Sequence, residues 1–238
     1  DLMLLFRSPE EEKYDYVQHF EMCKIDACII LGARNVPYEL DALRELKHRS
    51  MPFCLVNQHF PGEHFNEIDA DHVKGSYEAV RFLIAKGYKR IAFLNGPLQY
   101  SNSIDRLKGY KLALEESGFE VDQTLIYYGE YSRTSGLRAA NQIYEQLDRM
   151  DAVFAANDRM AAGLLQGLQE RGVKVGQSFP IIGYDNADIA AICNPPLTTV
   201  EVPFYDMGRM AGLKLIEMAD EEVLDPPFRT LLDTQLIV

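Results

Sequence analysis

Polar side chains that can hold a small molecule follow several short apolar runs of this sequence. In chain order they are Arg34, Asn57, Asn157-Asp158 and Asp185-Asn186. If each apolar run is a strand of a parallel sheet, these residues meet at the carboxyl edge, where such sheets bind ligands. An arginine together with amides and carboxylates can hydrogen-bond the hydroxyl groups of a polyhydroxylated small molecule.

Some of these polar residues also have a purely structural interpretation. Asn157 or Asp158 could cap the helix that follows, and Asp158 is the more expected cap. Asp185-Asn186 could form a turn that is closed by side-chain to backbone hydrogen bonds.

Three further candidates are Arg106, Tyr131 and Phe204. Arg106 could lie on the solvated face of a helix from Asn102 to Ser117, and the two aromatic residues could be plain core. No single residue decides the matter. Gathered at one edge of a sheet, they favour a binding cleft.

Motifs for catalysis are missing from the sequence. It has no Gly-x-Ser-x-Gly elbow, no Walker loop and no Gly-x-Gly-x-x-Gly fingerprint. The five histidines lack the spacing of metal ligands, and His59 and His64 are expected in a surface loop. We therefore predict a protein that is not an enzyme, with no catalytic residue, no metal site and no cofactor.

The composition narrows the class of protein. With 238 residues and 47% hydrophobic content, the chain can bury a sizeable core as one large domain or two linked lobes. Its formal charge of −12 repels the phosphate backbone, so this chain alone is not expected to bind nucleic acid. No run suits a membrane span or a signal peptide, which favours a cytoplasmic protein.

Cysteine usage supports the same compartment. The four cysteines are Cys23, Cys28, Cys54 and Cys193. Cys28 and Cys54 lie inside apolar runs and are expected to be small, reduced core residues rather than parts of a disulfide or zinc site.

The elements that position the polar residues follow an alternating pattern. Strands are expected at Leu2–Phe6, Ala27–Leu31, Phe53–Val56, Ile91–Leu94, Ile126–Tyr128, Ala152–Ala155 and Ile181–Tyr184, with weaker ones at Asn66–Ala70 and Leu197–Glu201. Stretches of helical period lie between them, and Gly87, Gly118 and Gly172 are expected left-handed residues after three helices. Glu10-Glu11-Glu12 is expected to begin a helix. The alternation predicts an α/β fold with parallel sheets and right-handed crossovers.

This number of strands exceeds what one open sheet usually needs. A split near Lys86–Arg90 gives two halves of similar pattern, and a final helix around Tyr205–Met218 precedes a strand-like run, Leu231–Val238. We therefore expect two closely packed lobes with more than one crossing of the chain between them.

Three sequence blocks resemble the LacI/GalR family of transcription repressors. The blocks are Lys89–Pro97 with Asp105–Tyr110 (DRLKGY), then Ala152–Gly163 (AVFAANDRMAAG), then Ile182–Asn186 (IGYDN) with Asn194–Val200 (NPPLTTV). They stand in the family's order and spacing over roughly the whole chain. The last block is more typical of the repressors than of the secreted sugar-binding proteins that share their fold.

The resemblance implies a fold of two Rossmann-like lobes, the periplasmic binding protein type I fold, with a crossover hinge. Lobe one would hold residues 1–86 and 204–230, and lobe two residues 87–203 and 231–238. The family's effector sits between the lobes. The matching positions are Arg106, Asn157 and Asp185 for hydrogen bonds, Tyr131 and Phe204 as aromatic walls, and, from loop position, Arg34 and Asn57.

The sequence also departs from the family pattern. The family begins with a helix-turn-helix headpiece and a hinge, which this sequence lacks, and Asp1–Phe6 matches the family's second strand rather than its first. Operator DNA would therefore be bound through a headpiece outside this chain.

The function implied is effector sensing and homodimerisation for a bacterial repressor, with a sugar or sugar derivative as the favoured effector. Ligand binding would bias two states of the dimer. Arg106→Ala is expected to abolish effector binding and leave the fold intact. The alternatives are a periplasmic sugar-binding protein of a transport system and, with less support, a small-molecule enzyme on a doubly wound fold.

Overall fold

The computed structural model describes residues 2–5, 15–23, 25–176, 178–220 and 226–238. The chain forms two compact units, one of Asp1–Asp69 with Phe204–Thr230 and one of Ala70–Pro203 with Leu231–Val238. The chain thus passes between the units three times. The expected first boundary, after residue 86, is wrong because residues 70–86 belong to the second unit.

Helix packing explains where this boundary falls. Residues 72–85 form α3 (His72–Ala85), which packs along α4 (Ser101–Glu116). A Cβ on Gly109 of α4 would lie 2.2 Å from the carbonyl oxygen of Val73, so only glycine permits this approach. The sequence pattern marks α3 as a helix but does not reveal this partner.

The second unit is built on a six-stranded sheet of order β10-β8-β7-β6-β4-β5. Its strands are β4 (Ile91–Asn95), β5 (Ile126–Tyr128), β6 (Ala152–Ala155), β7 (Ile181–Asp185), β8 (Thr198–Glu201) and β10 (Gln235–Ile237). Neighbouring strands are parallel except β10, which pairs antiparallel with β8. The expected parallel sheet therefore carries one antiparallel edge strand.

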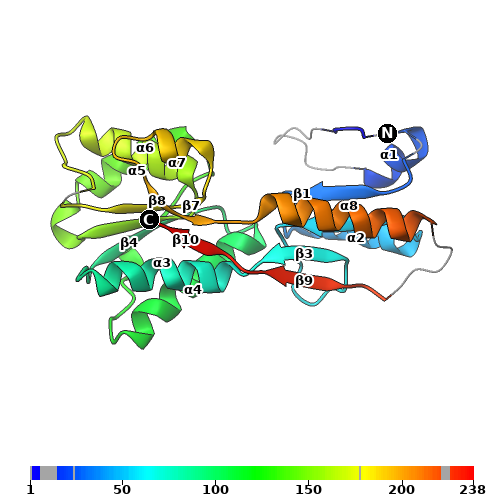
Figure 1. Cartoon of the computed structure of the whole chain (residues 1–238), viewed down its shortest axis with the longest axis horizontal. Helices are drawn as coiled ribbons and strands as arrows, with labels where there is room; N and C mark the ends of the chain where they lie inside the picture. Colours follow the sequence, from blue (N-terminus) through cyan, green and yellow to red (C-terminus); the bar gives the residue numbers. More distant parts are fainter. Residues whose placement is uncertain (1, 6–14, 24, 177, 221–225) are drawn as a thin grey trace. The chain divides into compact units, whose positions relative to one another are not determined.

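Helices cover both faces of this sheet (Figure 1). Helices α3 and α4 lie on one face, and α5 (Arg133–Tyr144), α6 (Asp158–Gln169) and α7 (Asp188–Ile192) lie on the other. Because both faces are covered, β4 and β6 are buried along their whole length, as their continuous apolar runs predict. The rings of Phe93 and Phe154 stack across these strands, with centroids 4.9 Å apart.

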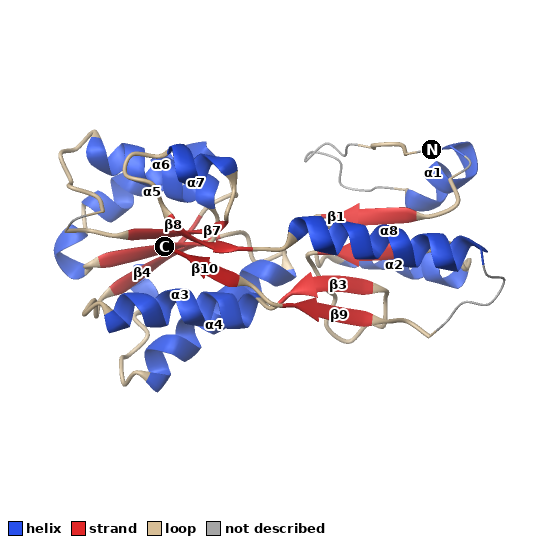
Figure 2. Cartoon of the chain, viewed as in Figure 1, coloured by secondary structure: helices blue, strands red, loops and turns tan. Residues whose placement is uncertain are grey.

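The first unit contains a four-stranded sheet of order β1-β2-β3-β9. Its elements are α1 (Tyr16–Cys23), β1 (Cys28–Leu31), α2 (Pro37–His48), β2 (Phe53–Val56), β3 (Glu67–Ala70), α8 (Phe204–Asp220) and β9 (Arg229–Leu232), shown by type in Figure 2. Leu43 and Leu46 of α2 pack with Phe53, Leu55 and Phe65 to form its core.

The expected buried strand at Leu2–Phe6 is wrong for the described residues 2–5, which are not in a strand and are exposed, Leu4 by 72%. An apolar run becomes a strand only where a neighbour supplies hydrogen bonds, which composition cannot show. Asp1, Phe6 and the acidic run Glu10-Glu11-Glu12 lie outside the described residues. Among the described helices, none is long and apolar enough to cross a membrane.

Candidate functional site

A topological switch point lies beside β4, the second strand from one edge of the sheet in the second unit. From β4 the chain continues to β5 on one side, and after α5 it returns to β6 on the other side. Ligands of open α/β sheets bind at such points, beyond the carboxyl ends of the strands. Arg106, on the helix after β4, donates from Nη1 to the carbonyl oxygen of Ala156, directly after β6, at 2.9 Å. The arginine therefore bridges the two diverging connections.

Arg106 is a buried charge, with only 2% of its surface exposed. Its Cζ lies 4.2 Å from the ring centroid of Tyr184, and Nη2 lies 3.5 Å from a carboxylate oxygen of Asp185. Within the described chain, its Nε has no hydrogen-bond partner. This burial rules out the solvated helix face as the position of Arg106. A buried guanidinium needs paired acceptors, and Asp185 with Ala156 supplies them.

Tyr131 lies over the start of α4. Its hydroxyl contacts Ser103 and donates to Oδ1 of Asn102 at 3.0 Å, and Nη1 of Arg106 lies 3.4 Å from it. A Cβ on Gly96 would lie 2.2 Å from the ring of Tyr131, so this position in the loop after β4 must be glycine. Burial raises the pKa of Tyr131, which keeps its hydroxyl protonated and able to donate.

Asn157 caps α6, because its side-chain oxygen accepts from the amide of Met160 at 2.9 Å. Its amide nitrogen also donates to the carbonyl oxygen of Tyr131 at 3.1 Å. The more expected cap, Asp158, is instead the first residue of the helix. The capping interpretation is therefore right for Asn157, and the same side chain also holds the Tyr131 loop.

Asp158 fixes the loop that carries Asp185. Its carboxylate is fully buried and accepts from the hydroxyl of Thr199 at 2.7 Å and from the amide of Ala187 at 2.8 Å. Burial raises its pKa to about 6. A Cβ on Gly183 would lie 2.0 Å from this carboxylate, so a side chain at residue 183 would displace it.

Asp185 and Asn186 both have positive φ angles, 101° and 54°. Two residues of β8 hold this turn, rather than side-chain to backbone hydrogen bonds within the turn itself. The hydroxyl of Thr199 accepts from the backbone amide of Asn186 at 3.3 Å, and Glu201 accepts from its side-chain amide at 3.2 Å. Burial raises the pKa of Asp185 to about 7, although nearby Arg106 acts in the opposite direction. Non-glycine residues with positive φ cost roughly 1–3 kcal/mol each and cluster at binding sites.

Four of the seven predicted site residues thus come together in the second unit: Arg106, Tyr131, Asn157 and Asp185. Arg106, Tyr131 and Asn157 follow β4, β5 and β6, and Asp185 ends β7. These four strands are adjacent in the sheet. Two arginine nitrogens, an amide, a phenol hydroxyl and a carboxylate meet there, and such a set can both donate to and accept from ligand hydroxyls.

The other three predicted residues belong to the first unit and are therefore not part of the cluster around Arg106. Arg34 pairs with the buried Glu39 at 3.4 Å, and its guanidinium lies over the ring of Tyr38. Asn57 follows β2 with a φ of 61°. Phe204 begins α8 and is 44% exposed, which excludes the plain-core interpretation for it.

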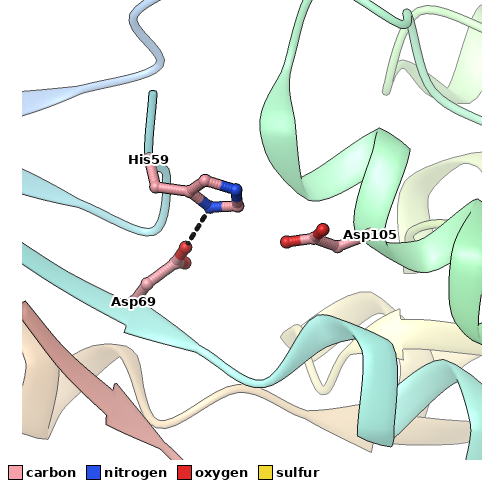
Figure 3. Close-up of side chains that lie close together, drawn as sticks. All are labelled: His59, Asp69 and Asp105. Atoms are coloured by element: carbon pink, nitrogen blue, oxygen red, sulfur yellow. Dashed lines mark hydrogen bonds and ion pairs between the residues drawn. The ribbon is translucent and has the colours of Figure 1, made fainter. Parts of the chain in front are cut away.

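His59 lies in a loop, as expected, but its side chain is only 12% exposed. Its Nδ1 lies 2.9 Å from Oδ2 of Asp69, and the aspartate is buried (Figure 3). Cys28 and Cys54 are free thiols, half-buried and buried, and burial raises the pKa of each to about 12. Cys193 is also free and half-buried, whereas the side chain of Cys23 is outside the described part.

Reasoning from the sequence missed Tyr184, Ser103 and Thr199 as parts of the site. Tyr184 lies inside an apolar run and was expected to be an ordinary strand residue. A buried tyrosine usually needs a partner for its hydroxyl, and this need was the available signal. Ser103 and Thr199 carried no signal, because small hydroxyl residues occur in many helices and strands.

Comparison with known proteins agrees with this architecture. A family model described as a periplasmic binding protein-like domain matches residues 80–238. The chain belongs to this family. The match includes the whole cluster around Arg106.

Relatives of this periplasmic-binding-protein-like domain are transcription regulators. The chain is 32% identical to the transcriptional repressor PurR of Vibrio atlanticus, over 87% of this chain and 61% of the relative. It is 33% identical to the repressor CytR of Escherichia coli, over 90% of this chain and 62% of the relative. The chain therefore spans about three fifths of the length of these relatives.

Solved structures give the same result. The domain matches a complex of the transcriptional regulator CelR with cellobiose at 29% identity and a TM-score of 0.84, covering 94% of this chain and 69% of the other. It matches a LacI-family regulatory protein from Chloroflexus aggregans at 26% identity and a TM-score of 0.83, covering 94% and 79%. The expected resemblance to LacI-type regulators and the expected fold are confirmed.

Proposed function

We propose that this domain senses a small-molecule effector for a bacterial transcription repressor, and that a sugar or sugar derivative binds beside Arg106. The observation that supports the proposal most directly is the cluster of Arg106, Tyr131, Asn157 and Asp185 at the switch point of the second sheet. A cluster of polar side chains on strained backbone at the strand ends lowers the stability of the fold, and a ligand-binding role explains its presence.

The chemistry of this cluster suits vicinal hydroxyl groups. The planar guanidinium of Arg106 presents donors in a fixed fork, and the carboxylate of Asp185 accepts from hydroxyl donors. Asn157 can donate and accept, and the ring of Tyr131 offers an apolar face to a sugar ring. A regulator of similar structure was solved with cellobiose, which supports the sugar class. Arg34, Asn57 and Phe204 are proposed contributors from the first unit.

Binding is tested by calorimetric titration of the purified chain with cellobiose, other sugars, sugar phosphates and purines. The matched pair of variants is Asp185→Asn and Asp188→Asn. The chemical change is the same in both, but Asp188 is an exposed residue at the start of α7. We expect one sugar to bind and only Asp185→Asn to weaken it, by about tenfold or more, since a hydrogen bond to a charged group contributes roughly 1.5–3 kcal/mol.

Equal affinities of the two variants would refute the proposed site. Tight binding of a purine or a sugar phosphate with no sugar binding would retain the sensing function and overturn the sugar class. Turnover of a bound compound would indicate the enzyme alternative. The relatives that the comparisons found are regulators, which favours a non-catalytic protein.

Partners of the whole protein are part of the same proposal. We propose a cytoplasmic homodimer that reaches operator DNA through a headpiece outside this chain, with no membrane partner. The net charge of −12 opposes DNA binding by this domain alone. Light scattering should give twice the 27.1 kDa of one chain. A monomer at all concentrations would favour the transport-protein alternative.

A further inference from the structure

Tyr184 connects the Arg106 cluster to the places where the chain enters the second unit. It belongs to β7, is fully buried, and its ring lies 4.2 Å from Cζ of Arg106. We propose that Tyr184 is a positioning residue that couples Arg106 to two crossing segments, residues 70–75 and 231–235. The inference deepens the proposed function and rests on it, because the coupling serves regulation only if Arg106 binds an effector.

The hydroxyl end of Tyr184 lies against both crossing segments. Nδ1 of the buried His72 is 3.1 Å from this hydroxyl, and the two rings lie 5.6 Å apart. A Cβ on Gly75 would lie 2.6 Å from the Tyr184 hydroxyl and 2.4 Å from that of Thr234. The side chains of Tyr184 and Thr234 therefore both approach the first turn of α3 at a position where only glycine leaves room.

The two crossing segments are also bound to each other. The amide of Asp71 donates to the carbonyl oxygen of Leu232 at 2.9 Å, and Nζ of Lys74 pairs with Asp233 at 2.6 Å. Residues 70 and 231 are the first residues of the second unit after two of the three crossings. Tyr184 thus contacts a single bonded pair of segments through which the chain connects the units.

The shape of the tyrosine makes it suited to transmit a displacement. Its ring is rigid, one face carries the guanidinium of Arg106, and the hydroxyl at the far end is held by His72. In a close-packed interior, a ring cannot tilt at one end without moving the groups at the other. A ligand that shifts Arg106 therefore changes the balance between two arrangements of the crossing segments.

The test is a double-mutant cycle read by hydrogen exchange of the purified chain, with no ligand added. Arg106→Lys, Tyr184→Phe and the double variant are compared, and the readout is the exchange rate of the Asp71 amide and of the backbone at 231–235. Tyr184→Phe keeps the ring and removes only the hydroxyl. Tyr110→Phe is the matched control, because that buried hydroxyl donates to Ile91 at 2.7 Å elsewhere in the same unit.

We expect Arg106→Lys to raise the hydrogen-exchange rate of the Asp71 amide by at least about twofold. A change of this size corresponds to the smallest interaction energies that are typical of residues in contact. In the Tyr184→Phe background this effect should vanish, whereas it should persist in the Tyr110→Phe background. An effect of Arg106→Lys that is the same in all three backgrounds would overturn the proposal, as would no effect in any.

Two further measurements keep the result interpretable. If Arg106→Lys does not fold, Asp185→Asn replaces it, because Asp185 holds the same guanidinium from another side. Titration with cellobiose and the other probes separately tests the proposed function. Absence of binding alongside an intact cycle would refute effector sensing at Arg106, and binding alongside a failed cycle would refute only the coupling.

Discussion

Replacing Asp185 with asparagine should stabilise the domain at neutral and alkaline pH while weakening its effector site. Burial raises the pKa of this carboxyl from 3.8 to about 7, and the attraction of Arg106 offsets only part of the cost. The folded state therefore binds a proton that the unfolded chain releases between about pH 4 and pH 7. Within that window, stability falls as pH rises. Asparagine resembles the protonated form at every pH and avoids this loss.

The size of the effect follows from the pKa difference. A rise from 3.8 to about 7 corresponds to at most about 4 kcal/mol at pH 8, at roughly 1.4 kcal/mol for each pH unit. The Asp185 side chain is 23% exposed, so solvent reduces this figure, and we expect about 2 kcal/mol. For a chain of this size, that stabilisation raises the melting temperature by about 4–8 °C.

The assay is urea unfolding of the wild type, Asp185→Asn and the exposed control Asp188→Asn between pH 4 and pH 8.5. The stabilisation by Asp185→Asn should be greatest at pH 8 and vanish near pH 4, while the control follows the wild type throughout. A difference that persists unchanged at pH 4 would report a backbone preference of asparagine for positive φ instead. Destabilisation of the Asp185→Asn variant at pH 8 would refute the reasoning, because it would show that the pair with Arg106 outweighs burial.

Three more predictions follow from the same site. Arg106→Ala should destabilise the domain by about 3 kcal/mol in urea unfolding, because it empties a buried volume and leaves Asp185 without its partner. This prediction replaces the expectation that the variant leaves the fold intact. Arg138→Ala is the control, and it should change stability little because Arg138 is exposed. Gly96→Ala should weaken effector binding in calorimetry by about tenfold, because the new methyl group collides with the ring of Tyr131, and unchanged affinity would argue against a role for that ring. Affinity for a hydroxyl ligand should fall as pH drops below about 7, where Asp185 becomes protonated, and calorimetry should show no such pH dependence in Asp185→Asn.

Strands were well predicted wherever a parallel sheet buries them on both faces. The expected bounds of β2 and β6, both buried along their whole length, agree with the structure residue for residue, as do those of the edge strand β5. Burial on both faces leaves a continuous apolar run bounded by polar residues, which is visible in sequence. The failure for residues 2–5 of the expected strand has the same origin, because an apolar run outside a sheet looks identical in sequence.

Site residues could be predicted where topology determines position. Asn157 lies two residues after β6 and Asp185 is the last residue of β7, so the end of each strand places them at the sheet edge. The first unit boundary could not be predicted in this way. It depends on α3 packing against α4 through Gly109, a contact between elements that no local pattern records.

Backbone strain connects the predicted site residues in a way that composition does not show. Asn57, Tyr131 and Asp185 have φ angles of 61°, 56° and 101°, and each follows or ends a strand. A tyrosine with positive φ is unusual, because its Cβ crowds the backbone, whereas asparagine and aspartate tolerate the region better. Glycine would remove the strain but also the side chain. Two of these strained residues, Tyr131 and Asp185, lie beside Arg106. Their turns are held by hydrogen bonds to Asn157 and Asp158 at the start of α6. The first turn of α6 therefore holds both turns in place, and this explains why two adjacent polar residues that looked like alternative caps are both needed.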